Sequence, residues 1–427
     1  MILILAFVLS FFLPWLLLVT KIAVIALAVI VLVDAATLFL PRRPILANRI
    51  CSDRFSNGDQ NKVQLKVYNN FPFTSQIEII DELPIQFQIH DFSKKVAAKS
   101  KESSIVEYSL RPVERGEYHF GSLLVYCKSP LQLLIRRIEF TQEERTIRVL
   151  PSYFLMRQYE LKAFSNNLQD GGSKKIRKIG HSLEFEQIKE YVRGDDIRSI
   201  NWKATARKGG LMVNNYTDEK SQQVYCLIDK GRVMKSPFNG LSLLDYAINA
   251  SLILSRVALI KQDRAGLITF DHQIGQVVPA SRVQGQMTNI LETLYNQQTR
   301  YLETDYEKLY AQLKFRVNQR SLLILFTNFE SMAGLERQLP YLRAISRSHL
   351  LLVVFFENTE LNQITSQKSQ SLEDIYMKTI AERFSYEKKR MVKELRKHGI
   401  FTILTEPENL TINTVNQYLE LKSRQAI

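Results

Sequence analysis

QVYCLID (residues 223–229), LSLLDYAINASLILSRVALI (241–260) and RAGLITF (264–270) follow one another in the second half of the chain. The first and third segments are short apolar runs typical of buried strands, and the second repeats apolar residues at helical spacing. The alternation continues with a helix around MTNILETLYNQ, the strand SLLILFTNF, the helix GLERQLPYLRAIS and the strand HLLLVVFF. Strands that alternate with helices predict a mainly parallel sheet with helices on both faces.

Polar residues stand where three of these strands end. Asp229 closes the first strand, Asp271 follows RAGLITF, and Asn328 follows SLLILF. Ligands of parallel sheets bind beyond the carboxyl ends of the strands, so we expect a functional site at this edge. Asp271 has an alternative role as the cap of a helix or turn, because its side chain accepts backbone N–H bonds.

The first forty residues are almost entirely apolar. MILILAFVLSFFLPWLLLVT and IAVIALAVIVLVDAATLFL each approach the ~20 residues that span a bilayer, and little more than Lys21 separates them. No basic segment precedes the first run, which disfavours a secretory signal. We therefore expect residues 1–40 to form two transmembrane helices. Asp34 is expected at the membrane interface or against the partner helix.

PRRP follows the second run directly. The positive-inside rule then predicts a two-pass protein of the cell (inner) membrane, with both termini and the large soluble part in the cytoplasm. Three cysteines without CxxC spacing agree with a reducing compartment and indicate neither a disulfide framework nor a zinc site. The net charge of +14 over 427 residues suits anionic lipid or nucleic acid as a partner, or simply a cytoplasmic location.

Residues 61–150 change to a period of two. NKVQLKVYNN, SQIEIIDELP, SIVEYSLRP and GSLLVYCKSP alternate apolar and polar residues and are punctuated by Asn, Pro and Gly. This pattern predicts short antiparallel strands, and hence an antiparallel β-sandwich domain over residues 45–153. Residues 154–221 follow as a basic connector and a charged block, and residues 222–427 form the α/β domain.

The charged block is EYVRGDDIRSINWKATARKGG, residues 190–210. An enzyme reading uses Asp195 and Asp196, for example in a metal-dependent hydrolase, but adjacent side chains diverge and no catalytic motif accompanies them. A nucleic-acid reading uses the basic residues around Trp202, from Arg193 to Lys208, yet no recognised nucleic-acid motif is present. A structural reading has Arg198 or Arg207 paired with the aspartates and the Trp202 ring buried, so that the block clasps the two domains together.

The same block resembles the signature of the domain-of-unknown-function 58 family of membrane-anchored bacterial proteins. The matching positions are Glu184, Phe185, Tyr191, Gly194, Asp195, Asp196, Arg198, Ile200, Trp202, Lys203, Thr205, Ala206, Arg207 and Glu219. The resemblance implies a tethered β-domain followed by a von Willebrand factor A-like (Rossmann-type) α/β domain. It also implies a MoxR-type AAA+ ATPase as partner, with a role in assembling or maturing other complexes.

A-like domains often hold a divalent cation through D-x-S-x-S, a threonine and a second aspartate. Here Gly231 and Val233 stand at the two serine positions after Asp229, and Asn328 replaces the second aspartate. Mg²⁺ needs several oxygen ligands, so the replaced residues predict a degenerate site that holds no metal and serves as a protein-contact surface.

These patterns together predict a membrane-anchored, non-enzymatic scaffold or adaptor that uses no cofactor. Its expected partners are the lipid bilayer, a MoxR-type AAA+ ATPase and other membrane proteins, with no nucleic acid. The alternatives are a metal-dependent hydrolase or a nucleic-acid-binding protein that uses the charged block around residues 195–208.

Overall fold

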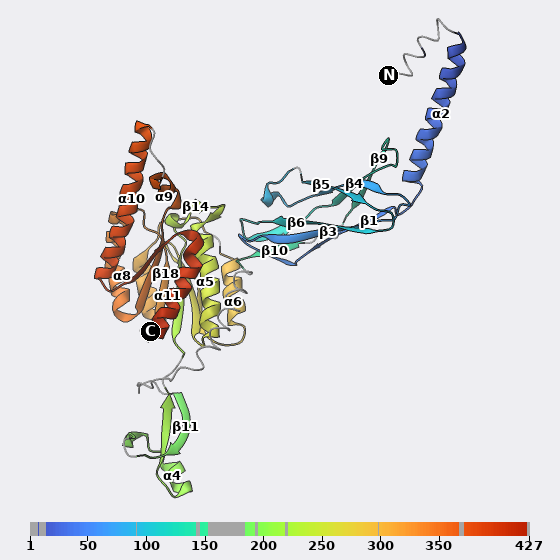
Figure 1. Ribbon diagram of the computed structural model, residues 1–427. Helices are drawn as coiled ribbons and strands as arrows, with labels where there is room; N and C mark the ends of the chain where they lie inside the picture. Colours follow the sequence, from blue (N-terminus) through green and yellow to red (C-terminus); the bar gives the residue numbers. More distant parts are fainter. Residues whose placement is uncertain are drawn as a thin grey trace. The chain divides into compact units, whose positions relative to one another are not determined.

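The computed structural model describes residues 7, 14–90, 92–141, 146–152, 184–192, 195–217, 221–297, 299–366 and 371–424 (Figure 1). The chain divides into two compact units, Met1–Leu150 and Pro151–Ile427. The first holds an apolar helix and a sheet-rich region, and the second holds an α/β region. The finer boundaries expected at residues 40, 153 and 221 stay predictions.

One helix, α2 (Pro14–Phe39), takes up most of the N-terminal apolar sequence. It runs through Lys21 without a break, so the boundary expected there between two apolar helices is wrong. A single lysine is tolerated because long basic side chains can lay their aliphatic stems along apolar surface, and Pro14 suits the first turn, where no backbone N–H is needed. Leu17–Phe39 is long and apolar enough to cross a membrane. Residues 1–13, apart from Phe7, lie outside the described residues, so the second crossing stays a prediction.

The described residues of the sheet-rich part of the first unit form ten strands. They are β1 (Ile45–Cys51), β2 (Arg54–Ser56), β3 (Asn61–Asn69), β4 (Ser75–Asp81), β5 (Ser93–Ala98), β6 (Ser103–Leu110), β7 (Gly116–His119), β8 (Leu123–Lys128), β9 (Ile135–Phe140) and β10 (Thr146–Leu150), with a 3₁₀ turn η1 (Ile85–Phe87). The sheets have the orders β1-β3-β6, β2-β10-β7 and β5-β4-β8-β9. Every pair is antiparallel except β2 with β10, which confirms the expected strand-rich, mainly antiparallel unit.

Alternation along these strands builds the core of the first unit. On β3, Val63, Leu65 and Val67 are fully buried while the residues between them face outward. One buried charge pair interrupts this apolar core: the Arg49 guanidinium bonds the Asp81 carboxylate, which also accepts the Tyr108 hydroxyl. Burial and the neighbouring Asp81 charge raise the pKa of Tyr108 above its ordinary value, so its hydroxyl stays protonated and serves as a donor.

The α/β region is built on one six-stranded sheet. Its strands are β13 (Gln223–Asp229), β16 (Arg264–Phe270), β17 (Ile274–Ser281), β18 (Leu322–Phe326), β19 (Leu350–Phe356) and β20 (Phe401–Thr405), in the order β17-β16-β13-β18-β19-β20. All neighbours are parallel except β17, an antiparallel edge strand that the sequence pattern did not predict. The parallel strands at 223–229 and 264–270 begin and end where the sequence predicts.

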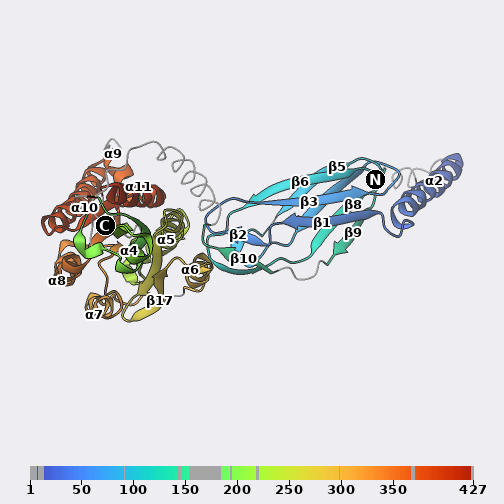
Figure 2. The ribbon, with the colours of Figure 1, turned by 90° about the horizontal axis from the view of Figure 1, so that it is seen from below.

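Helices cover both faces of this sheet (Figures 1 and 2). One face packs against α5 (Leu243–Ile260), α6 (Gln286–Tyr295) and α11 (Leu410–Ser423), and the other against α7 (Tyr306–Arg316), α8 (Met332–Ser348) and α10 (Leu372–Lys397). A short helix, α9 (Thr359–Ser366), adjoins α10. The predicted doubly covered sheet is confirmed. Although α5 is also long and apolar enough to span a membrane, 72% of it is buried, so it is a core helix.

Short elements complete this region. They are the 3₁₀ turns η4 (Arg232–Met234) and η5 (Pro407–Asn409) and the two-residue strands β14 (Pro237–Phe238) and β15 (Leu241–Ser242). Ser242 caps α5 and exchanges hydrogen bonds with Asp245 in a capping box, which fixes the start of the buried helix directly after β15.

Candidate functional site

The strand order reverses between β13 and β18, and this is where ligands of open parallel sheets bind. Asp229 is the last residue of β13, and Thr327 and Asn328 follow β18 directly. The structure therefore brings together Asp229 and Asn328, two of the residues that the sequence singled out, at one edge of the sheet.

Asp229 is fully buried, and four protein groups donate to its carboxylate. Oδ1 accepts the Gly231 backbone N–H (2.7 Å) and the Thr304 hydroxyl (2.6 Å), while Oδ2 accepts the hydroxyls of Thr327 (2.6 Å) and Tyr306 (3.4 Å). Burial raises the pKa of the Asp229 carboxyl, and these four hydrogen bonds oppose the rise. The carboxylate is held by hydroxyl and amide donors, so its hydrogen-bonding capacity is already taken up by the protein itself.

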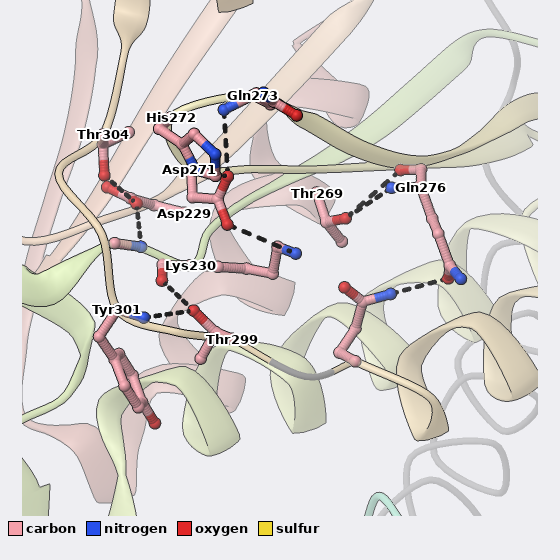
Figure 3. A network of polar contacts seen from close by, with 12 residues as sticks. Asp229, Lys230, Thr269, Asp271, His272, Gln273, Gln276, Thr299, Tyr301 and Thr304 are labelled. Atoms are coloured by element: carbon pink, nitrogen blue, oxygen red, sulfur yellow. Dashed lines mark hydrogen bonds and ion pairs between the residues drawn. The ribbon is translucent and has the colours of Figure 1, made fainter.

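Residues 299–305 form a loop that lies over Asp229 (Figure 3). Four hydrogen bonds fix it: the Thr304 hydroxyl to Asp229, the Thr299 hydroxyl to the Lys230 carbonyl (2.7 Å), the Arg232 N–H to the Leu302 carbonyl (3.1 Å), and the Asp305 N–H to the Asp271 carbonyl (3.0 Å). A Cβ at Gly231 would lie 1.9 Å from Thr304 Oγ1. The absence of a side chain at residue 231 is thus what admits the threonine hydroxyl to the carboxylate.

Asp271 organises the neighbouring turn (Figure 3). Its Oδ1 accepts the Gln273 N–H (3.1 Å) and lies 2.9 Å from His272 Nδ1, while Oδ2 lies 3.8 Å from the Lys230 ammonium. The first of these bonds spans two residues, as in an aspartate turn. The predicted turn role of Asp271 is therefore confirmed, and Lys230 is directed toward Asp271.

The Asn328 side chain accepts a hydrogen bond from a lysine on a helix that is distant in the sequence. Lys388 of α10 donates from Nζ to Asn328 Oδ1 (2.6 Å) and to the Phe329 carbonyl (2.6 Å), and Nζ lies 5.5 Å from the centroid of the Phe355 ring. Burial lowers the pKa of Lys388 to about 8. The ammonium is thus held by two neutral oxygens and an aromatic face, and a cation belonging to the chain itself stands beside the replaced aspartate position.

The side-chain oxygens at this edge do not suit the divalent cation that the family resemblance suggests. Gly231 and Val233 supply no side-chain oxygen, Asn328 Oδ1 already accepts a hydrogen bond from the Lys388 ammonium, and both Asp229 oxygens already accept hydrogen bonds from protein groups. Mg²⁺ requires about six oxygens in near-octahedral geometry. Within the described ranges, moreover, no group of three or more His, Cys, Asp or Glu side chains is placed to hold a metal ion.

The charged block folds as a small module around a strand pair. β11 (Glu184–Glu190) pairs antiparallel with β12 (Met212–Thr217), with Glu184 opposite Thr217, and between them lie η3 (Ile197–Ser199) and α4 (Trp202–Lys208). Asn201 caps the start of α4, and Gly209 closes its end in a left-handed conformation (φ 72°), which glycine adopts without strain.

The two adjacent aspartates of this module have separate partners. Asp195 accepts from the Lys189 ammonium (2.7 Å) and the Val192 N–H (3.0 Å), whereas Asp196 accepts the Arg198 N–H (3.0 Å) and caps η3. The hydrogen bond from Lys189 lowers the pKa of the Asp195 carboxyl. The predicted pairing with the Arg198 or Arg207 guanidinium is not among the described contacts, in which Lys189 of β11 and two backbone N–H groups bond the carboxylates. No hydrogen bond joins the two aspartates to a common group among the described contacts.

The exposure of the Trp202 ring also differs from the prediction. The ring is 69% exposed on the first turn of α4, so the expected burial is wrong: the seven-residue helix has no buried residue and builds no core around the ring. Arg198, Lys203, Arg207 and Lys208 are exposed on the same module, and the Tyr191 N–H bonds the Leu211 carbonyl (2.9 Å). Arg193, Gly194 and Glu219 lie outside the described residues, as do residues 153–183 and the side chain of Glu184. The clasp role of the block stays a prediction.

Four residues at the sheet edge form hydrogen bonds with Asp229 or Asn328 but were not predicted as site residues: Thr304, Tyr306, Thr327 and Lys388. Lys388 was detectable, because it falls on one helical stripe with Ala381, Met391 and Leu395, which are all buried. The basic run around it is more typical of a solvated face. The hydroxyl residues carry no comparable sequence signal.

A family model described as "Protein of unknown function DUF58" matches residues 187–383, which confirms the predicted resemblance. An uncharacterized protein, YeaD, from Bacillus subtilis (strain 168) is 26% identical over 182 residues, which cover 40% of this chain and 44% of that protein. The chain thus matches less than half of that relative's length.

Two solved structures show limited similarity. A conserved hypothetical protein BatB from Bacteroides thetaiotaomicron is 13% identical with a TM-score of 0.32, over 48% of this chain and all of that one. An aerotolerance-related membrane protein from Bacteroides fragilis NCTC 9343 is 11% identical with a TM-score of 0.28, over 46% of this chain and 98% of that one. TM-scores this low do not establish a shared fold.

Proposed function

We propose that this chain, which carries a DUF58 region at residues 187–383, is a membrane-anchored, non-enzymatic scaffold that binds protein partners through the carboxyl edge of its α/β sheet. The proposal treats the α/β region as von Willebrand factor A-like and the sheet-rich unit as an antiparallel β-sandwich spacer. The apolar helix α2 supplies the membrane attachment. The two-pass topology and the cytoplasmic location of the soluble part belong to the same proposal.

The sealed carboxylate of Asp229 is the observation that carries the proposal. A group that reacts with a substrate or binds a cation must keep a position open to it, as catalytic metal centres do. Asp229 instead has no exposed surface and accepts four protein hydrogen bonds. The buried polar groups around Asp229 therefore have a structural role: they hold the loop above them in place. We assign partner recognition to the exposed residues over this edge.

The surface above the sealed edge carries both signs of charge. Arg232 on η4 is 75% exposed and lies 3.8 Å from Glu330, and Arg337 of α8 lies 3.5 Å from Glu303 of the covering loop. Such exposed pairs contribute little to stability. They are available to exchange partners with a docking protein, where charge complementarity favours the right partner and its orientation.

The resemblance implies the class of that partner, a MoxR-type AAA+ ATPase that works on the assembly or maturation of other complexes. A membrane-fixed scaffold suits this role, because tethering raises the effective concentration of the ATPase next to membrane clients. We include this partner class in the proposal, together with other membrane proteins as clients.

The exposed Trp202 with Lys203, Arg207 and Lys208 favours a second reading, in which the module binds nucleic acid. An aromatic side chain among basic residues is the usual platform for stacked bases. The hydrolase alternative has less support, because Asp195 and Asp196 have different partners.

The proposal is tested by pull-down of the full-length protein from native membranes, with and without ATP. The wild type is compared with Arg232→Glu at the carboxyl edge and with Arg320→Glu, a matched exposed arginine that precedes β18 at the opposite edge. We expect an AAA+ ATPase with the wild type and Arg320→Glu, and at least a fivefold loss with Arg232→Glu. Equal recovery from both variants would contradict the proposed surface. Nucleic acid that is retained at high salt would favour the second reading.

A further inference from the structure

The turn between β8 and β9 (residues 129–134) has an apolar tip that the scaffold role does not use. Leu131, Leu133 and the first residue of β9, Ile135, are 56%, 52% and 56% exposed. Ser129 holds the turn in shape, since its N–H bonds the Leu134 carbonyl (3.0 Å) and its hydroxyl accepts the Leu134 N–H (3.1 Å). Three large apolar side chains on an ordered turn form a patch that water does not favour.

Hydrogen bonds fix this turn to the end of the membrane helix. The Leu131 N–H donates to Asp34 Oδ1 of α2 (3.2 Å), so this oxygen of Asp34 faces the sheet-rich part of its own unit. Arg136 of β9 donates from Nη1 to the carbonyls of Leu38 (2.8 Å) and Pro41 (3.0 Å), where α2 ends. Figure 1 shows the β9 hairpin beside the lower end of α2. The turn and the helix therefore share one depth relative to any membrane that α2 crosses.

The length of α2 sets that depth. Leu17–Phe39 has 23 residues, which span ~35 Å at 1.5 Å per residue, against a hydrocarbon core of ~30 Å. Asp34 lies five residues before the end of this segment, or ~7.5 Å at the same rise. The hydrogen bond at Asp34 thus brings the backbone of Leu131 to the level of the last turns of the apolar helix, where the hydrocarbon gives way to the headgroups.

Three arginines lie at or just after the end of α2 to which the turn is bonded. Arg42 and Arg43 are exposed directly after α2, and Arg136 is placed at the helix end with its guanidinium 5.6 Å from the Phe39 ring centroid. Arginines at this level reach anionic phosphates while their stems lie along apolar surface. An apolar tip with arginines at the adjacent helix end is the pattern of a segment that lies in the membrane interface.

We propose that the β8–β9 turn inserts Leu131, Leu133 and Ile135 into the face of the bilayer that α2 enters, as a second, shallow membrane contact. The occupant of the patch is lipid, because the patch continues the surface of the membrane helix at the same depth. This contact fixes the sheet-rich unit against the membrane and leaves its opposite end in water. The inference rests on α2 being a membrane helix and does not depend on which protein the α/β region binds.

The test uses the full-length protein in vesicles of phosphatidylcholine and phosphatidylglycerol, with a nitroxide on a cysteine introduced at one position. The background carries Cys51→Ser, since the other two cysteines are buried. Leu133→Cys is the test variant, and Val29→Cys, on the exposed surface of α2, is the reference for lipid. Ile85→Cys is the matched reference for water: Ile85 is 88% exposed, and the register of β4 with β8 places it beyond the opposite end of the sheet.

We expect oxygen to relax the label at residue 133 more than a water-soluble nickel complex does, as at residue 29, with the reverse order at residue 85. A label at 133 that behaves like the one at 85 would place the turn in water and overturn the proposal. A label at 133 shielded from both reagents would also overturn it, because a protein surface would then cover the patch.

Discussion

The Thr304 hydroxyl donates to Asp229 Oδ1 across 2.6 Å, from a loop that lies 75 residues further along the chain. The bond exists because Gly231 leaves room for it: a Cβ there would lie 1.9 Å from the same hydroxyl. Position 231 is a serine in the pattern of A-like cation sites. The glycine found there removes that hydroxyl and leaves space for the Thr304 hydroxyl, which bonds Asp229 instead. This bond helps to close the carboxyl edge of the sheet over Asp229.

Removal of a hydroxyl from the Asp229 network should destabilise the α/β region. Thr304→Val or Thr327→Val leaves a buried carboxylate with one donor fewer, which costs about 1–3 kcal/mol of unfolding free energy. Thr288→Val, on the exposed side of α6, is the control and should change stability by less than about 0.5 kcal/mol. Urea unfolding of the full-length protein in detergent micelles measures the difference. Similar values for all three variants would show that the network does not support the fold.

A side chain at residue 231 should also be costly. Gly231→Ala forces the Cβ against Thr304 and should destabilise the protein by about 1–3 kcal/mol. Gly334→Ala is the matched control, because a Cβ there meets only Ser331 Oγ at 3.5 Å, and alanine favours the helix in which residue 334 lies. A thermal shift of Gly231→Ala no larger than that of Gly334→Ala would contradict the close approach at residue 231.

Mg²⁺ should leave the stability of the wild type unchanged, because the oxygens at the sheet edge already accept protein donors. The measurement is the melting temperature of the full-length protein with millimolar MgCl₂, with NaCl of equal ionic strength as the control. Ligand binding to the native state raises stability by mass action, so a clear rise specific to Mg²⁺ would show that the edge opens and binds the ion.

Lys388 should make stability depend on pH at alkaline values. Burial lowers its pKa to about 8 from an ordinary 10.5, so the unfolded chain binds more protons than the folded protein between these values. Stability therefore rises with pH across this window. We expect the unfolding free energy of the wild type, relative to Lys388→Met, to increase between pH 8 and 10. A difference that is constant with pH would place the amine in water and contradict the burial.

The exposed ring of Trp202 gives the charged block a direct optical signal. With Trp15→Phe as background, Trp202 is the only tryptophan in the chain, and its emission should be red-shifted and readily quenched by iodide. Binding of a partner to this module should shift the emission to the blue and protect it from iodide. A blue-shifted, protected emission in the free protein would show that another part of the chain covers the ring.

Periodicity predicted much of this fold because the strands of the parallel sheet are buried on both faces. QVYCLID and RAGLITF are continuous apolar runs for that reason, and their ends were predicted to the residue. β17 was missed because it is an edge strand with polar residues and Pro279, which weaken the alternation of a strand. The boundary at Lys21 was wrong because one charge does not end an apolar helix.

The sequence predicted two residues of the candidate site but not the residues that bond them. Asp229 and Asn328 follow from the rule for strand ends, but their partners come from a loop and a helix that are close only in the folded chain. The surroundings of Trp202 and Asp195 were not predicted for a related reason. Trp202 lies on a helix without buried residues, and Asp195 bonds Lys189 across the module, and composition alone specifies neither.

Site-specific photo-crosslinking at residue 232 is the most direct test of the central claim. A photoreactive phenylalanine analogue replaces Arg232 at the carboxyl edge or Arg320 at the opposite edge, in the full-length protein in its native membrane. We expect irradiation to join an AAA+ ATPase to position 232 and not to position 320. Capture of the same proteins from both positions, or of none from position 232, would contradict a scaffold that binds its partner through the sealed edge of the sheet.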